Sequence, residues 1–162
     1  MKIKNFMTMM VAVVAVMLGV CSCGSDDDDP VVALASQVVG SYTGNEIIMV
    51  MGEESSNRNT TYEITKASDS TVDMLIPESG EMGMVIPALT VKNIPLTDVG
   101  SSISGKLAKY EGTVKNAKGD EKAYTINNLT VLVNDKKAVV TFSLKYGNMP
   151  MAMETSFTGT KK

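Results

Sequence analysis

Apolar and polar residues alternate with a period of two through most of the chain after residue 38. Between Ala138 and Leu144, for example, every second residue is apolar, whereas Thr141 and Ser143 occupy the opposite face. Successive side chains of a β-strand point to opposite sides of a sheet, so this alternation is typical of antiparallel strands with one buried and one solvated face. The pattern predicts strands at residues 39–51, 58–66, 70–76, 82–86, 88–97, 102–115, 122–134, 136–146 and 149–160.

Turn-forming residues separate these stretches, as at residues 52–57, and no helical period or internal repeat occurs among them. Many short strands at this spacing predict an all-β barrel or sandwich. One short helical turn is expected at residues 31–38, before the first strand. Within 122–134 the apolar parity changes at Asn127 and Asn128, which predicts a β-bulge.

The first 22 residues have a different composition. Lys2 and Lys4 precede an almost entirely apolar run from Phe6 to Val20. Such a run has about the 7–15 residues of a signal-peptide core and is shorter than the roughly 20 residues that span a membrane. We therefore interpret residues 1–22 as a cleaved signal peptide rather than as a retained membrane anchor.

The two cysteines of the chain, Cys21 and Cys23, lie at the end of this apolar run. The stretch Val20-Cys21-Ser22-Cys23 looks like a lipobox, in which an apolar residue and a small one precede the modified cysteine. Ser22 is a good small residue directly before a cut, whereas a cut before Cys21 would put the branched Val20 there. We therefore predict cleavage after Ser22 and lipidation of Cys23, which leaves the mature chain without a free thiol.

Residues 23–37 are predicted to tether the lipid to a folded domain at 38–162. The tether contains an acidic run, Asp26 to Asp29. A run of like charges is typical of a solvated, extended linker. A lipidated cysteine followed by serine and acidic residues also resembles the surface-export signal of lipoproteins from gut-commensal Gram-negative bacteria. These features predict an outer-membrane lipoprotein that faces the cell exterior.

Charge argues against nucleic acid as a partner. The formal net charge is −3, and removing Lys2 and Lys4 with the leader leaves 13 basic residues against 18 acidic ones, a charge of −5. Binding to nucleic acid requires a basic face that neutralises phosphates, and this composition does not provide one. The predicted partners are the membrane, through the lipid, and either a small hydrophobic ligand or an envelope protein.

The chain has no histidine, and Cys23 is predicted to carry lipid. The commonest general base and metal ligand are therefore missing, and with them Ser-His-Asp and Cys-His arrangements, and no free cysteine remains as a nucleophile. Pairs of carboxylates can support glycoside hydrolysis, but most of the acidic residues fall on the solvent faces of strands, and nothing in the sequence pairs two of them. We predict a non-catalytic protein with no cofactor and no metal site. The carboxylates considered are Glu46, Glu63, Asp73, Glu81, Glu111 and Glu154.

Methionines recur at a period of two in a chain with no tryptophan. They can serve as ordinary core, because methionine fills irregular gaps. They can also line a deformable apolar cavity, since an eight-stranded barrel is wide enough to hold one small ligand. Capture of Cu(I) by thioethers is the third reading, and it has no histidine or cysteine to support it. The candidate cavity residues are Tyr42, Met49, Met51, Met82, Met84, Met149, Met151, Met153 and Phe157.

Three short motifs behind the acidic tether resemble those of the calycin-like β-barrel lipoproteins of gut commensals. They are Val39-Gly40-Ser41-Tyr42-Thr43-Gly44, Leu89-Thr90-Val91-Lys92-Asn93-Ile94-Pro95-Leu96-Thr97 and Ser156-Phe157-Thr158-Gly159-Thr160-Lys161-Lys162. The resemblance runs from about Val38 to the C-terminus and implies an antiparallel up-and-down β-barrel of about eight strands, closed by its first and last strands. Tyr42 stands where true lipocalins carry a tryptophan, so lipocalin ligand preferences do not transfer directly.

Two functions follow from this fold. The first is a binding module that takes a small hydrophobic or amphipathic ligand in the barrel mouth, near Tyr42, the methionines and Phe157. The alternative is a protein–protein interaction component of a cell-envelope assembly, with a solidly packed barrel. An internal cavity would favour the first, and a filled core with an exposed apolar patch would favour the second.

Overall fold

The computed structural model of the protein describes residues 32–81 and 84–162. Within these residues, no helix is long and apolar enough to cross a membrane. Several sequence predictions concern parts of the chain outside this description: the signal peptide (1–22), Cys21, Cys23, most of the linker (23–37), Met82 and the side chain of Glu81.

One short helix and ten strands make up the described residues. The helix α2 (Leu34–Val38) falls within the predicted helical turn. The strands are β1 (Gly40–Val50), β2 (Glu53–Lys66), β3 (Thr71–Ile76), β4 (Ser79–Glu81), β5 (Met84–Ile86), β6 (Leu89–Asp98), β7 (Ile103–Lys115), β8 (Glu121–Asn134), β9 (Lys137–Tyr146) and β10 (Met153–Lys161).

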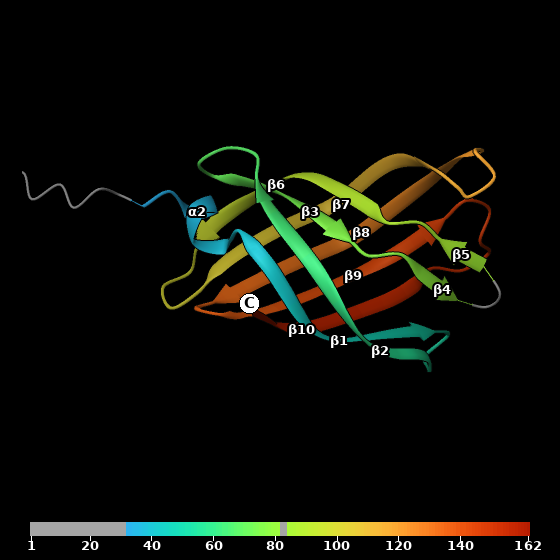
Figure 1. Cartoon of the computed structure of the whole chain (residues 1–162), viewed down its shortest axis with the longest axis horizontal. Helices are drawn as coiled ribbons and strands as arrows, with labels where there is room; N and C mark the ends of the chain where they lie inside the picture. Colours follow the sequence, from blue (N-terminus) through green and yellow to red (C-terminus); the bar gives the residue numbers. More distant parts are fainter. Residues whose placement is uncertain (1–31, 82–83) are drawn as a thin grey trace, which may run out of the picture. The chain divides into compact units, whose positions relative to one another are not determined.

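Eight of these strands form a closed antiparallel barrel in the order β1-β10-β9-β8-β7-β6-β3-β2, as Figure 1 shows. Strands that follow one another in the chain are neighbours in the barrel, and the first pairs with the last, so the topology is up-and-down. The small β4–β5 hairpin interrupts this order between β3 and β6. The predicted fold class is confirmed.

Three strands differ from their predicted bounds by more than one residue. Of the predicted strand at 82–86, residues 84–86 form β5, which pairs with β4. Strand β2 begins at Glu53 rather than at 58, because its polar first residues pair with β1 through the main chain and show no apolar alternation. Strand β10 begins at Met153 rather than at 149, because Gly147 has a φ of 56° and Pro150 has no N–H to donate to a sheet.

The predicted β-bulge lies in β8. The pairing of β8 with β9 shifts register between Asn127 and Thr130, and Asn128 has a φ of 53°. The bulge inserts an extra residue and so switches the parity of the strand. As a result, Ile126 and Leu129 both face the barrel interior and are buried.

A pair of glycines allows the barrel to close. Gly44 of β1 lies opposite Gly159 of β10. A Cβ added to Gly44 would lie 2.1 Å from the carbonyl oxygen of Thr158, and one added to Gly159 would lie 2.3 Å from the ring of Phe157. Only glycine fits at these two positions, so the backbones of β1 and β10 can approach closely there. The ring of Phe157 then lies inside the barrel, against Gly159.

The end of the barrel at which β1 starts is covered by α2. The side chains of Ala35 and Val38 are buried, and α2 packs against β2, β3 and β6. The Tyr42 hydroxyl donates to the Val38 carbonyl oxygen at 2.8 Å, which fixes the helix to the barrel wall. The β4–β5 hairpin lies at the opposite end (Figure 1). The two ends therefore differ: α2 packs over one of them, where a pocket of about 260 Å³ lies beside Gln37 and Ile103, and the β4–β5 hairpin lies at the other.

The barrel is expected to lose stability between pH 10 and pH 12. Burial, with a smaller effect of Tyr110, raises the pKa of Tyr124 from 10.0 to about 12, although the Tyr124 hydroxyl also donates to the Thr90 carbonyl oxygen at 2.6 Å. Because the folded pKa is the higher one, the contribution of Tyr124 is complete below pH 10 and is lost as the pH rises through about 12. Urea unfolding at a series of pH values measures this loss.

The variant Tyr124→Phe provides the control for this pH dependence. It removes the titrating group, so its free energy of unfolding should fall less steeply above pH 10 than that of the wild type. Burial also raises the pKa of Tyr42, Tyr62 and Tyr146, so some alkaline loss should persist in the variant. Equal slopes for variant and wild type would contradict the assignment to Tyr124.

Candidate functional site

A pocket of about 480 Å³ opens at the end of the barrel opposite α2. We call it the mouth pocket. It lies between the start of β8, the end of β9, the loop that follows β9, and Met84 of β5. Its lining residues are Met84, Glu121, Lys122, Ala123, Tyr146, Gly147, Asn148, Met149 and Pro150.

Backbone hydrogen bonds hold the loop that forms one wall of the mouth pocket. The N–H of Gly147 donates to the Ala123 carbonyl oxygen at 2.8 Å, and the N–H of Met149 donates to the Tyr146 carbonyl oxygen at 3.2 Å. Gly147 adopts the left-handed conformation that reverses the chain there. The loop therefore presents Met149 to the pocket from a defined position.

The mouth pocket combines apolar walls with a polar rim. Met84, Met149 and the Tyr146 ring supply deformable or flat apolar surface, and Lys122 and Asn148 supply polar groups. The volume falls within the range of roughly 300–1,000 Å³ that is usual for small-molecule sites. The pocket can therefore hold a small molecule with one apolar and one polar part.

The hydroxyl of Tyr146 is buried and has no hydrogen-bond partner among the described residues. The residue as a whole is only 4% exposed. Leaving a buried hydroxyl unpaired costs about 1–3 kcal/mol. Burial also raises the pKa of Tyr146, so the group keeps its proton at neutral pH. Tyr146, one of the residues that line the mouth pocket, thus carries one unused donor.

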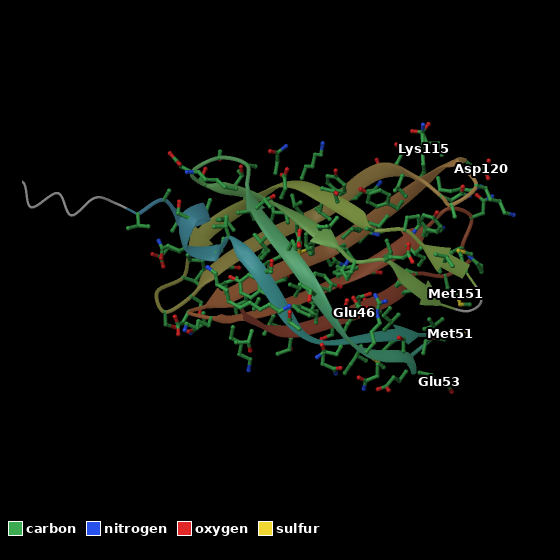
Figure 2. The ribbon with its side chains drawn as sticks, viewed as in Figure 1. Glu46, Met51, Glu53, Lys115, Asp120 and Met151 are labelled. Atoms are coloured by element: carbon green, nitrogen blue, oxygen red, sulfur yellow. The ribbon has the colours of Figure 1, made fainter. Side chains whose placement is uncertain are left out.

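A second polar group lies inside the barrel. Glu46 of β1 is 1% exposed and stands opposite Arg58 of β2 in the pairing register. The Nε of Arg58 donates to Oε1 of Glu46 at 2.6 Å, and the Tyr62 hydroxyl donates to Oε2. Burial and the Glu46 carboxylate raise the pKa of Tyr62 well above its ordinary value. These three residues form the interior polar cluster, and Figure 2 shows Glu46 about midway along the barrel.

Glu46 is the exception among the candidate carboxylates with described side chains. Most of them were expected on solvent faces, but Glu46 faces inward with the other even-numbered residues of β1, as Tyr42 and Ile48 do. Their shared parity was the signal that could have placed Glu46 inside. The same parity along β2 groups Arg58 with Tyr62, and neither residue was predicted as part of a site.

The other candidate carboxylates with described side chains lie on or near the solvent faces that the alternation predicted. Glu63, Glu111 and Glu154 are exposed. Asp73 is half-buried, and its carboxylate accepts from the backbone N–H of Asn93 at 2.8 Å. Within residues 32–81 and 84–162, no group of three or more histidine, cysteine, aspartate or glutamate side chains is placed to bind a metal.

The structure does not bring the candidate cavity residues together. Met49 has the outward parity of β1, and Met51 lies in the turn that follows β1, so they face solvent with 38% and 78% of their surface exposed, which corrects the expectation that they line the interior. Figure 2 shows Met51 and Met151 at the end opposite α2. Tyr42 lies instead beside α2. A period of two places residues on one face of a strand, but it does not say which face the barrel encloses.

The remaining candidates divide between the interior and the mouth. Met153 and Phe157 are completely buried, and the Phe157 ring stacks on Tyr62 with centroids 4.2 Å apart. Met84 and Met149 line the mouth pocket. Among the described members of the predicted set, only these two methionines therefore lie together at a pocket, and Tyr146 joins them without having been predicted.

A shallow groove of about 320 Å³ crosses the outer face of β1, β10 and β9 next to the bulge in β8. We call it the outer groove. Ile47 and Met49 supply its apolar part, and Thr141, Ser143 and Glu154 supply polar groups. Met49, which faces outward from β1, therefore lines this groove and not the barrel interior.

Comparison with known proteins agrees with this architecture. The family model of the calycin-like beta-barrel domain matches residues 38–160. None of the curated proteins matches the sequence. Among solved structures, the barrel is similar to a Bacteroides fragilis protein assigned to the outer membrane, with a TM-score of 0.63 and 20% sequence identity. The match covers 80% of this chain and 53% of that protein, and at this identity it shows a shared fold alone.

Proposed function

The chain belongs to the family of calycin-like β-barrel domains, and on this premise we propose that it is a lipid-anchored, non-catalytic binding module of the outer membrane. In this proposal the mouth pocket takes a small hydrophobic or amphipathic ligand. The observation that carries it is a pocket that joins Met84 and Met149 with Tyr146, whose buried hydroxyl has no partner among the described residues, and with the polar Lys122 and Asn148. A ligand with one polar atom and an apolar body matches that lining.

The proposed location rests on the sequence and on one structural likeness. The apolar leader, the stretch around Cys23 and the acidic run are those of an exported lipoprotein. The similar Bacteroides fragilis protein is assigned to the outer membrane, and this chain spans about half of it. A non-catalytic role is supported by the missing histidine and by the solvent-facing positions of Glu63, Glu111 and Glu154.

Native mass spectrometry of the protein purified from its own membranes tests the binding role. We expect a bound small molecule, or a mass shift on titration with fatty acids. Repeated absence of any co-purifying molecule, together with no shift on titration, would sink the ligand proposal.

The variant Tyr146→Phe should weaken ligand binding about fivefold, because it removes one neutral hydrogen bond. The same variant should raise the free energy of unfolding of the unliganded protein by about 1 kcal/mol, since no unpaired hydroxyl is then buried. Titration with the ligand found by mass spectrometry and urea unfolding measure the two effects.

Tyr110→Phe is the matched control for Tyr146→Phe. Tyr110 is half-buried, and it does not line the mouth pocket. Its variant should leave ligand affinity unchanged. Unchanged affinity in Tyr146→Phe as well would remove the hydroxyl from the proposed site.

The outer groove favours the alternative function, a protein–protein component of an envelope assembly. Met49 is 38% exposed there beside Ile47, on a face that the barrel core does not use. Cross-linking in intact cells distinguishes the two proposals. The alternative would be favoured by a partner protein whose cross-linking is abolished by Met49→Glu and is unchanged by Tyr146→Phe.

A further inference from the structure

Methionine accounts for half of the large apolar side chains that the described residues expose. Four of these eight side chains are methionines, and each is at least 38% exposed. Two other methionines, Met74 and Met153, are completely buried in the core. The gap-filling role of methionine therefore explains the buried pair but not the exposed group, whose members are Met49, Met51, Met84 and Met151.

Met84 differs from the other exposed methionines because it also lines the mouth pocket. Its side chain is well exposed, at 40%. Met149 lines the same pocket but is only 9% exposed, and Met51 and Met151 are not among the lining residues. Met84 is therefore the one described methionine that a small reagent in solution reaches readily and that also forms part of the pocket.

Strand β5 fixes the position of Met84. In the β4–β5 hairpin, Met84 pairs with Glu81, and Ile86 pairs with Ser79. Met84 and Ile86 are two residues apart, so their side chains lie on the same face of β5. Ile86 is buried in the core, whereas Val85 on the opposite face is exposed. The face of β5 that carries Met84 is thus turned toward the barrel, and Ile86 anchors it there.

Methionine is the most readily oxidised side chain of the folded domain, which starts after the two cysteines of the chain and has no tryptophan. A hydroperoxide converts its thioether to a sulfoxide. The sulfur lone pair attacks the terminal peroxide oxygen, and the O–O bond breaks as the S–O bond forms. The proton of the attacked oxygen moves to the departing one, which leaves as an alcohol, or as water when the oxidant is hydrogen peroxide. The sulfur is oxidised by two electrons, and the peroxide takes up both.

We propose that Met84 is a modification site at which a hydroperoxide switches the mouth pocket to a state of low affinity. This inference rests on the function proposed for that pocket, the binding of a ligand with an apolar body. Oxidation places a polar S–O group on the wall where Met84 and Met149 supply apolar surface. An apolar ligand that covers this group removes it from water without offering it a hydrogen bond, and this lowers the affinity.

Peptide mapping by mass spectrometry tests whether the site is oxidised. The protein purified from its own membranes is treated with hydrogen peroxide at neutral pH, and samples are stopped with catalase and digested. We expect Met84 and Met51 to form sulfoxide at comparable rates. The buried Met74 and Met153 should react at least about tenfold more slowly, because their sulfurs are reached only when the fold opens.

Titration with octanol, which has an apolar chain and one hydroxyl, tests whether the modification controls binding. Oxidation of the wild type should weaken octanol binding about tenfold. Met84→Leu keeps the volume and the apolar character of the side chain but has no sulfur, so its affinity should be the same before and after treatment with peroxide. Met51→Leu is the matched control. It removes an exposed methionine that does not line the pocket, so peroxide should weaken its binding as much as that of the wild type.

The proposal is overturned if Met84 keeps its thioether while Met51 is fully oxidised. It is also overturned if Met84 is oxidised and the affinity for octanol stays the same, or if peroxide weakens binding by Met84→Leu as much as binding by the wild type. In each of these cases the untreated wild type still binds octanol, and the function proposed for the mouth pocket is unaffected. If the untreated wild type binds no octanol, the pocket does not take an amphipathic ligand, and both the proposed function and the modification site are contradicted.

Discussion

Replacing Cys23 with alanine is expected to move the protein from the membrane fraction to the soluble fraction. The predicted lipid is a diacylglycerol in thioether linkage together with an N-acyl chain. Each buried CH₂ of such chains contributes about 0.8 kcal/mol, so several chains anchor a protein stably and their loss removes the anchor. Fractionation of cells and labelling with palmitate measure the change.

Cys21→Ala is the matched control for this experiment. Cys21 is predicted to leave with the signal peptide, so the variant should remain labelled and membrane-bound. If Cys23→Ala stays labelled and membrane-bound while Cys21→Ala does not, cleavage occurs two residues earlier than predicted.

Replacing Arg58 with methionine should lower the free energy of unfolding by about 3 kcal/mol, because breaking a buried pair leaves one charge without its partner. Glu46 would keep only the Tyr62 hydroxyl, at a position that is 1% exposed. The methionine side chain fills much of the space of the arginine side chain. The loss of stability therefore comes mainly from the unpaired charge of Glu46 and less from a cavity. Urea unfolding near neutral pH measures it.

A triple variant separates the pair from the packing around it. Glu46→Leu, Arg58→Met and Tyr62→Phe together remove both charges and the hydroxyl that Glu46 accepts from. Such a replacement should be as stable as the wild type or more so. A triple variant as unstable as Arg58→Met alone would show that the interior polar cluster stabilises the fold.

The fold was largely predictable because its main determinant is local. Alternation along each strand marks one face for burial, and most predicted strands appear in the barrel within a few residues. The bulge at Asn127 and Asn128 was predictable for the same reason, since a change of parity within one strand is visible in the sequence. The polar start of β2 was missed because main-chain pairing to β1 holds it, and the sequence pattern does not record such pairing.

The candidate site was much less predictable. A pocket at the mouth depends on which strand ends meet around the barrel, and Met84, Tyr146 and Met149 come from separate parts of the chain. The methionine pairs were visible as pairs, but Met49 and Met51 were assigned to the wrong side of the wall. Tyr146 was not predicted because whether its hydroxyl finds a hydrogen-bond partner depends on residues that are close in space and distant in the sequence.

By itself, the sequence determined a β-rich domain after an apolar N-terminal run, with a bulge at Asn127 and Asn128 and with no histidine. These properties follow from composition and from the order of neighbouring residues. The tertiary structure alone decided that Glu46 and Arg58 face each other inside the barrel and that Met49 faces out. Closing the sheet chooses which face becomes the interior, and it sets the register between strands. Both result from contacts between residues distant in the chain.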